Sequence, residues 1–148
     1  MNLRPAAIRA MGRSHRAVYR LTRGRLLGRV AGMPVLLLTT TGRHSGRPRT
    51  TPLTYFESGP DLVIVASNGG EDRPPAWWLN LQHDPHARVT IGAQPEEVTA
   101  RSATGDEYAR LWETIVSVHA GYAAYARRTT RPIPVLVLAR TNENAPSR

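Results

Sequence analysis

The segment LTTTGRHSGRPRTTPL, spanning Leu38–Leu53, decides the fold. Its two outer parts are rich in threonine and leucine, which favour strands, and they flank a loop in which Gly42 and Gly46 permit a sharp reversal. We therefore expect two antiparallel strands joined by residues 42–49. The three arginines of this loop, together with Ser45, could hold phosphate oxygens through charge-assisted hydrogen bonds. A solvated hairpin tip of ordinary basic character is equally compatible with these residues.

Strand signals continue on both sides of this segment. Runs of β-branched and aliphatic residues, bounded by Gly, Pro, Asn or Asp, predict strands at 35–41, 50–57, 62–67, 88–91, 97–103 and 133–139. Two helices are expected, a short one over 75–82 and a longer one from Asp106 to about Arg127, which Thr104 and Glu107 would open as a capping box. This pattern predicts a mainly β, α+β fold, a small barrel of about six antiparallel strands rather than a βαβ sheet.

Composition bounds the class of protein. The 148 residues, 41% of them hydrophobic, suit one domain with a tail. All 20 basic residues are arginine, and eleven of them lie in residues 1–56, where no acidic residue occurs, so this half must meet an anion or stay solvated. The absence of cysteine excludes disulfides, thiolate metal ligands and cysteine nucleophiles. No apolar run approaches the ~20 residues of a membrane span, and no secretory signal is evident, so we expect a cytoplasmic protein.

The sequence divides into three parts. Residues 1–32 are expected to form a basic helix over 5–22 followed by a tail. The thin apolar stripe of this helix would suit the anionic inner face of the cell membrane, a partner subunit or a mobile tail. Residues 33–140 would form the barrel domain, and residues 141–148 a disordered end.

Two further segments carry candidate site residues. Ser67–Gly70 follows a predicted strand, and its small residues would expose successive N–H groups to an anion or a ring edge; a plain turn is the alternative. In the helix over 75–82, Trp77 and Asn80 share a face. One tryptophan of this helix is expected to fill the core and the other to wall a flat ligand, while Asn80 could bond a ring carbonyl.

The longer predicted helix places His119, Tyr122 and Tyr125 within one arc. A histidine and two phenols could thus face a substrate pocket together, although tyrosines at helical spacing more often pack in a core with their hydroxyls reaching water. Elsewhere, His83 and His86 flank a proline turn with no third ligand nearby, so we expect no metal site.

Taken in order, these segments resemble the deazaflavin-dependent nitroreductase family. The resemblance runs from about Met33 to Ala139 and depends on four motifs in register: the segment at 38–53, Ser67–Gly70, a Pro-x-Trp-x-Leu-Asn pattern at Pro75–Asn80, and Pro134-Val135. It implies a split β-barrel related to the proteins that bind flavin mononucleotide (FMN). It also implies an oxidoreductase that transfers a hydride from reduced coenzyme F420 to a quinone, an enone or a nitro compound.

The resemblance assigns roles by position. Four residues would meet the phosphate and polyglutamate tail of the coenzyme: Arg43, His44, Ser45 and Arg49. The groove would be lined by Thr50, Thr51, Pro52, Leu53, Thr54, Val65, Ala66, Ser67 and Asn68 and closed by Ala76, Trp77, Trp78, Leu79 and Asn80. Tyr122 and Tyr125 match an aromatic helix beside the coenzyme and substrate, where His119 replaces a family tyrosine. One of these three side chains, or water, would protonate the reduced acceptor.

Two alternatives stay open at this level. FMN would also place a phosphate on arginines and a tricyclic ring against Trp77, and its absorbance would distinguish it. A basic nucleic-acid-binding barrel would suit the net charge of +9, but the aromatic residues cluster on the predicted helices rather than between arginines of a sheet face. We therefore expect no nucleic-acid partner, but a small hydride acceptor and, as in related split barrels, a second copy of the chain.

Overall fold

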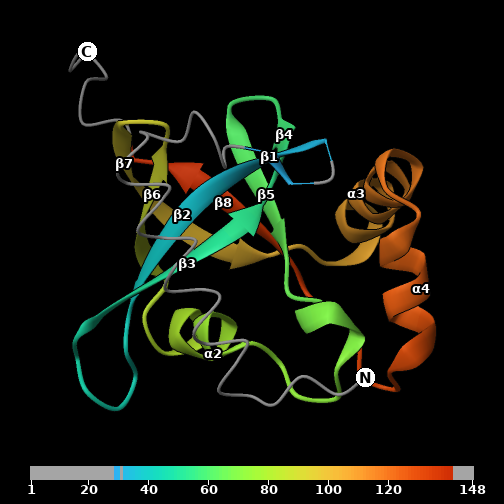
Figure 1. Ribbon diagram of the computed structural model, residues 1–148, viewed down its shortest axis with the longest axis horizontal. Helices are drawn as coiled ribbons and strands as arrows, with labels where there is room; N and C mark the ends of the chain where they lie inside the picture. Colours follow the sequence, from blue (N-terminus) through green and yellow to red (C-terminus); the bar gives the residue numbers. More distant parts are fainter. Residues whose placement is uncertain (1–28, 31, 142–148) are drawn as a thin grey trace.

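The computed structural model describes residues 29–30 and 32–141, so the predicted N-terminal helix and the C-terminal end over 142–148 lie outside the described residues. A curled sheet forms the body of the molecule, with α2 below one end and α3 and α4 along one side (Figure 1). The strands are β1 (Arg29–Val30), β2 (Met33–Thr41), β3 (Pro48–Thr54), β4 (Phe56–Ser58), β5 (Asp61–Val65), β6 (His86–Ile91), β7 (Gln94–Ser102) and β8 (Val135–Arg140). The helices are a 3-10 turn (Asn68–Gly70), α2 (Ala76–His83), α3 (Gly105–Val118) and α4 (Gly121–Arg128).

The order of the strands requires the sheet to close on itself. All pairings are antiparallel and run β1-β2-β6-β7-β8-β5-β4, with β3 also paired to β2. β3 and β4 therefore belong to opposite ends of the sheet, yet only Tyr55 separates them in the chain. Because one residue spans at most ~3.6 Å, the two ends must meet. The predicted split barrel is confirmed, and the strand expected over 50–57 divides at Tyr55, whose N–H donates to the carbonyl of Pro34 (3.2 Å).

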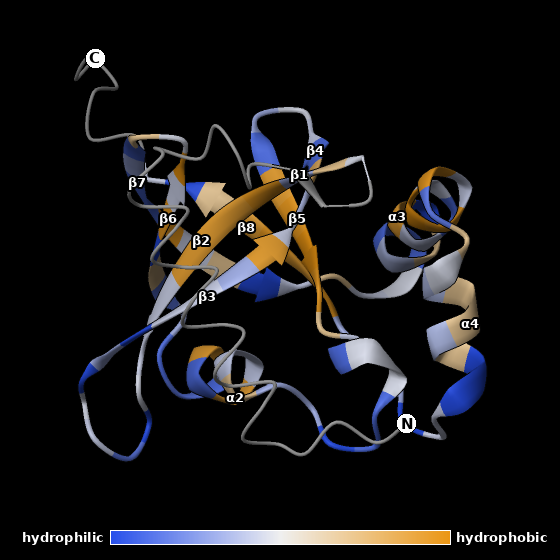
Figure 2. Cartoon of the chain, viewed as in Figure 1, coloured by the Kyte–Doolittle hydropathy of each residue, from blue (hydrophilic) through white to orange (hydrophobic). Residues whose placement is uncertain are grey.

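The sheet is buried on both faces where β5 and β8 pair. Alternate residues such as Leu62 and Ile64 join the cluster inside the curl, which α2 closes with Trp77 and Leu81. The intervening residues, Val63 among them, lie in a second cluster beneath α3 and α4. The hydropathy colouring accordingly shows apolar stretches over much of β2, β5 and β8 (Figure 2). The second cluster fixes α4 against the outside of the barrel.

The prediction of one long helix over 106–127 is wrong. α3 ends where the N–H of His119 bonds the carbonyl of Ile115 (2.9 Å), and α4 begins where the N–H of Gly121 donates to the Nδ1 of His119 (3.2 Å). The imidazole lies so close that a Cβ on Gly121 would be 2.7 Å from its Cε1. The break is therefore built from a glycine and the histidine side chain folded over it.

The expected capping box at the start of α3 is also wrong. Thr104 makes no side-chain hydrogen bond to the helix start. Glu107 instead accepts a hydrogen bond from the Nη2 of Arg101 (2.9 Å), as one half of an ion pair with the neighbouring strand. This arginine holds the pKa of the Glu107 carboxyl below its usual range, mainly through that hydrogen bond. A cross-element charge pair has thus replaced the local cap.

Candidate active site

The basic loop predicted between the first two long strands is the tip of the β2–β3 hairpin. The N–H of Gly42 bonds the carbonyl of Arg47 and the N–H of Gly46 bonds the carbonyl of Gly42, both at 2.8 Å. Gly46 has φ +70°, and a Cβ on Gly42 would lie 2.8 Å from the Oγ of Ser45. Ser45 itself accepts a hydrogen bond from the N–H of Arg47 (3.1 Å). The two glycines and the serine therefore shape a closed loop that presents its arginines at one end of the barrel.

Asn80 of α2 anchors this loop from below. Its Oδ1 accepts hydrogen bonds from the backbone N–H (3.2 Å) and the Nη1 (3.0 Å) of Arg43, and its Nδ2 donates to the Oγ1 of Thr40 (3.1 Å). The side chain is 3% exposed. Arg43 thus occupies both lone pairs of the amide oxygen, and Thr40 takes one of the two Nδ2 hydrogens. The structure shows Asn80 holding this loop, and its bond to a ring carbonyl, which Nδ2 would have to donate, stays a prediction.

A cavity of about 340 Å³ lies between the hairpin tip and α2, and we call it the arginine cavity. It is lined by Gly42, Arg43, His44, Ser45, Arg49, Thr51, Ala76, Trp77 and Asn80. All four residues predicted to meet an anionic tail are among them. Guanidinium groups beside a serine hydroxyl favour phosphate or carboxylate oxygens, because hydrogen bonds between a positively charged donor and a negatively charged acceptor are stronger than neutral ones.

A larger groove of about 830 Å³ adjoins this cavity, and we call it the tyrosine groove. Its lining consists of Thr51, Pro52, Leu53, Thr54, Val65, Ser67, Asn68, Gly69, Glu71, Arg73, Pro74, Pro75, Ala76, Trp77 and Tyr122. Side chains alternate between the two faces of a strand, so four consecutive residues of β3 can line one groove only if it runs along the edge of that strand. The two spaces share Thr51, Ala76 and Trp77 and therefore lie next to each other.

Tyr122 of α4 brings a hydroxyl to this groove. The Oη lies 2.8 Å from the Oγ1 of Thr54, and the residue is 8% exposed. Burial raises the pKa of Tyr122, the hydrogen bond with Thr54 lowers it to a smaller extent, and Tyr125 raises it further. The phenol is therefore protonated at neutral pH and able to donate a hydrogen bond or a proton.

His119 and Tyr125 support Tyr122 from behind. Both rings meet the ring of Tyr122 edge-on, with centroids 5.6 Å and 5.7 Å away. The predicted cluster of a histidine and two phenols is thus brought together despite the broken helix. Among the three, only Tyr122 belongs to the lining of the tyrosine groove as the described residues form it.

The loop after β5 departs from the expected row of exposed N–H groups. The N–H of Gly70 bonds the carbonyl of Ser67 (2.9 Å), and the N–H of Glu71 bonds the carbonyl of Asn68 (3.3 Å). The Asn68 side chain turns back to the carbonyl of Arg73 (2.9 Å). One amide of the expected cradle, that of Gly70, is therefore used inside the loop, as is the next one at Glu71. The loop lines the groove with Ser67, Asn68 and Gly69.

Besides His119 and Tyr125, four residues predicted to bind the cofactor lie away from the lining of both spaces. Ala66 is fully buried in the core, and Trp78 packs against the same cluster with its Nε1 buried and without a hydrogen-bond partner. Thr50 pairs its hydroxyl with that of Thr39 (2.9 Å), and Leu79 belongs to neither lining. Trp77 fills both of the roles that were expected of two different tryptophans: it is buried in the core, at 6% exposed, and it also lines both spaces.

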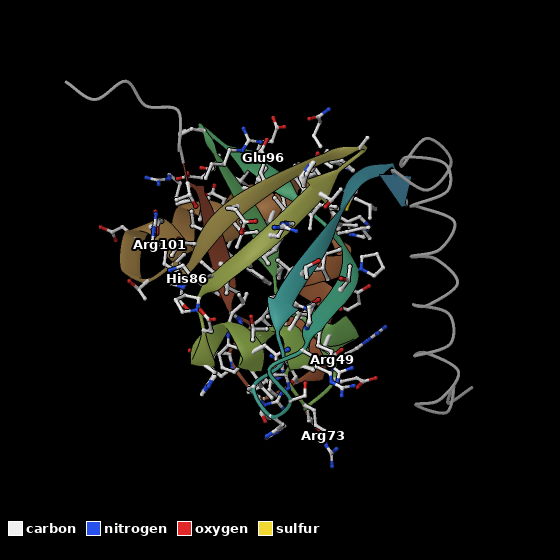
Figure 3. The ribbon with its side chains drawn as sticks, turned by 90° about the vertical axis from the view of Figure 1, so that its left-hand side faces the viewer. Arg49, Arg73, His86, Glu96 and Arg101 are labelled. Atoms are coloured by element: carbon white, nitrogen blue, oxygen red, sulfur yellow. The ribbon has the colours of Figure 1, made fainter. Side chains whose placement is uncertain are left out.

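Arg73 and Glu71 line the groove without having been predicted. Arg73 is exposed, and Figure 3 shows it projecting from the same end of the molecule as Arg49. Its position directly before the Pro-Pro pair that leads into α2 was the available signal. Within the described part of the chain, no group of three or more His, Cys, Asp or Glu could hold a metal ion, and no helix there has the length and apolarity that crossing a bilayer requires.

The family model for F420H(2)-dependent quinone reductases matches residues 11–140. The chain belongs to that family. The F420H(2)-dependent quinone reductase Rv1261c of Mycobacterium tuberculosis is 45% identical over 132 residues, covering 86% of this chain and 89% of that protein. The match to the family model begins 22 residues before the resemblance that the sequence motifs define, and so includes part of the basic N-terminal segment.

Solved structures agree with this assignment. The F420-H2 dependent reductase FDR-A superposes with a TM-score of 0.65 at 36% identity, covering 71% of this chain and 93% of that one. A structure described as a domain-swapped dimer gives a TM-score of 0.67 at 33% identity, with 84% and 95% covered. The predicted resemblance is confirmed: this chain is an F420H2-dependent reductase with the split-barrel fold, and its cofactor is reduced F420.

The geometry fits such a cofactor. A flat ring attached to an acidic tether needs cationic donors at one end of its site and a broad, mostly apolar slot at the other. The arginine cavity supplies Arg43 and Arg49, and the tyrosine groove continues from it along the edge of β3 past Trp77. Because the two spaces share Thr51, Ala76 and Trp77, one extended molecule could contact both.

Proposed function

We propose that this protein is a quinone reductase in which the arginine cavity holds the anionic tail of F420 and the tyrosine groove holds its ring beneath the acceptor. The observation that carries the proposal is that the two spaces share three lining residues, with guanidinium groups in one and a buried, protonated phenol in the other. The names of the relatives, which describe quinone reductases, support the choice of acceptor.

Bound reduced F420 supplies a hydride to the acceptor. The protein would position the two reactants. Apolar walls from Pro52, Leu53 and Trp77 hold flat molecules and displace water. Holding the reacting atoms about 3–3.5 Å apart lowers the entropic part of the activation free energy for hydride transfer. The Tyr122 hydroxyl, oriented by Thr54, donates a hydrogen bond to the oxygen on which negative charge develops and then its proton.

The lining of the groove favours an uncharged, flat acceptor with a carbonyl oxygen. Pro52, Pro74 and Pro75 offer rigid apolar surface, and about 830 Å³ lies within the range of pockets that accept drug-sized ligands. A quinone meets these requirements and presents a carbonyl for Tyr122. Enones and nitro compounds also carry an oxygen acceptor, so turnover measurements must rank the three classes.

The test begins with a fluorescence titration of the purified protein with F420, followed by oxidation of reduced F420 with menadione, cyclohexenone and a nitroimidazole. Arg49→Ala removes a cationic donor from the arginine cavity and should weaken F420 binding by roughly tenfold or more, the value of a charge-assisted hydrogen bond. Turnover should be fastest with menadione. Faster turnover of the enone or the nitroimidazole would overturn the choice of acceptor.

Arg88→Ala is the matched control for that variant. It makes the same change of charge at an exposed arginine that pairs with Glu97 between β6 and β7 (2.7 Å). Its F420 affinity should equal that of the unmodified protein. Equal affinity in Arg49→Ala as well would remove the coenzyme tail from the arginine cavity.

A further inference from the structure

Arg131 lies in the segment between α4 and β8 and binds the backbone of the loop after β5. Its Nη1 donates to the carbonyl of Ala66 (3.2 Å), its Nη2 to the carbonyl of Ser67 (2.9 Å), and its Nε to the carbonyl of Glu71 (3.0 Å). A guanidinium group suits this arrangement because its five N–H donors form a rigid planar fork. One side chain thus ties down both ends of residues 67–71, which we call the groove loop.

A second set of contacts joins the same segment to the groove loop. The buried hydroxyl of Thr129 donates to the Oδ1 of Asp72 (3.2 Å) and accepts from the N–H of Arg131 (3.3 Å). At Gly70, where φ is +81°, a Cβ would lie 3.1 Å from both the Cα and the carbonyl oxygen of Tyr125. The backbone of α4 therefore packs directly against the loop at this point.

These two elements form facing parts of the tyrosine groove. The groove loop contributes Ser67, Asn68 and Gly69 to the lining, and α4 contributes Tyr122. Arg131 itself is absent from that lining, so it acts only through the loop that it holds. Apart from a long contact with the adjacent carbonyl of Pro132 (3.4 Å), its carbonyl partners are 60 to 65 residues away in the chain, which means that no local structure would replace the connection.

We propose that Arg131 is a positioning residue that sets the width of the tyrosine groove, and thereby the affinity for the flat coenzyme ring. The inference rests on the proposed function, because it requires the ring to lie in that groove. Without the guanidinium group, the groove loop keeps its internal hydrogen bonds and its packing against α4 at Gly70, but its two ends lose their anchor, so the position of Ser67 and Asn68 opposite Tyr122 is less tightly fixed.

The test compares Arg131→Ala and Arg131→Lys with Arg101→Ala in the full-length protein. Arg101 is an equally polar, ion-paired arginine that Figure 3 places across the view from Arg49 and Arg73. The Kd for F420, measured by fluorescence titration, should rise by about tenfold in Arg131→Ala, as expected for the loss of hydrogen bonds to a charged group. Arg131→Lys should stay impaired, because one ammonium cannot bridge three carbonyls, and Arg101→Ala should bind normally.

Steady-state kinetics and rescue separate positioning from simple destabilisation. A positioning role predicts a higher KM for reduced F420 with much of kcat retained at saturation, and recovery of affinity in Arg131→Ala on adding millimolar guanidinium chloride but not sodium chloride. A purely structural role would lower kcat through a smaller folded fraction and leave KM and Kd unchanged, which would overturn the proposal. If Arg131→Ala does not fold, Thr129→Val replaces it in the test. This variant loses the contact with Asp72, which also holds the groove loop to the segment after α4, and its Kd for F420 must therefore rise.

The outcomes also distinguish the two proposals. If the unmodified protein binds F420 and Arg49→Ala weakens binding while Arg131→Ala does not, the proposed function stands and the role of Arg131 is refuted. If Arg49→Ala leaves binding unchanged, the placement of the coenzyme is wrong and the inference about Arg131 is refuted with it.

Discussion

Replacing Tyr122 by phenylalanine isolates the role of one hydroxyl group. The ring and its edge contacts with Phe56, His119 and Tyr125 are retained, and the hydrogen bond to Thr54 is lost. Thr54 is only half-buried beside the groove, so water can satisfy its hydroxyl afterwards. The cost in folding stability is therefore that of one neutral hydrogen bond, about 1 kcal/mol, or a fall in Tm of roughly 2–4 °C for a chain of this size.

The effect on catalysis should be much larger than the effect on stability. General acid catalysis contributes about 10²–10⁴-fold to a rate, so kcat for menadione should fall within that range if Tyr122 donates the proton. F420 affinity, measured by fluorescence titration, should change little because the groove keeps its shape. The variant would then combine a near-normal Kd with a low kcat.

The pH profile gives a second signature. Burial raises the pKa of Tyr122, so the protonated form is favoured in the folded protein. The contribution of this protonated form to the free energy of unfolding is fully present below the ordinary tyrosine pKa of about 10, and it is lost as the pH rises through the raised pKa of Tyr122. Turnover that depends on the hydroxyl should accordingly be level through neutral pH and decline only in strongly alkaline solution, and Tyr122→Phe should lack that decline.

Tyr108→Phe is the matched control. Its hydroxyl donates to the carbonyl of Ile133 at the same distance of 2.8 Å, and burial likewise raises its pKa. This tyrosine packs in the second cluster and lies outside the lining of the groove. Both variants should lose a similar amount of stability, but only Tyr122→Phe should lose turnover. Equal kcat values in the two variants would refute the assignment of the proton donor to Tyr122.

Three further predictions follow from contacts elsewhere in the molecule. Asn80→Ala should lower Tm and weaken F420 binding together, because it frees Arg43 and leaves buried polar groups unpaired at about 1–3 kcal/mol each; a normal Kd in a calorimetrically destabilised variant would contradict this. Gly42→Ala should weaken F420 binding with little loss of Tm, since its Cβ would push the Ser45 hydroxyl from its place 2.8 Å away. Glu107→Gln should remove a pH-dependent part of the free energy of unfolding. Because the pKa of Glu107 is lowered in the folded protein, this part is present above the ordinary glutamate range and is lost as the pH falls through the lowered pKa. Urea titrations at several acidic pH values would measure it.

The sequence predicted the strands and the basic hairpin because their signals are local. Alternating or continuous β-branched runs and glycines at turns act over a few residues, and the observed bounds of β2, β6 and β8 differ from the expected ranges by only two residues or fewer. The division at Tyr55 could not be predicted in this way. It arises because the closed sheet moves the chain from one edge to the other, and residues 50–57 carry no local break.

The site was predicted in part for the same reason. Motifs identified the hairpin and α2, whose side chains line the arginine cavity. Arg131 could not be found, because its partners at the groove loop are backbone carbonyls, which have no sequence signature, and these lie 60 or more residues away. The break in the helix at His119 was not predicted either. Helical spacing alone already placed His119, Tyr122 and Tyr125 together, and the two separate helices bring the same three rings into contact.

The place where the barrel is split explains why the site forms there. In the described residues, β3 pairs with β2 alone, so its second edge carries backbone groups that no neighbouring strand covers along Thr51–Thr54. Proline is tolerated within a sheet at such an edge, and Pro52 occupies it. The chain leaves this edge at Tyr55. β5 ends at Val65, and the groove loop that follows it forms the opposite wall of the tyrosine groove. A fully closed barrel would have used these edges for hydrogen bonds between strands. Under the proposed function, the split makes them available to a flat ligand, and α2 and α4 supply the tryptophan and the tyrosine that the strands lack.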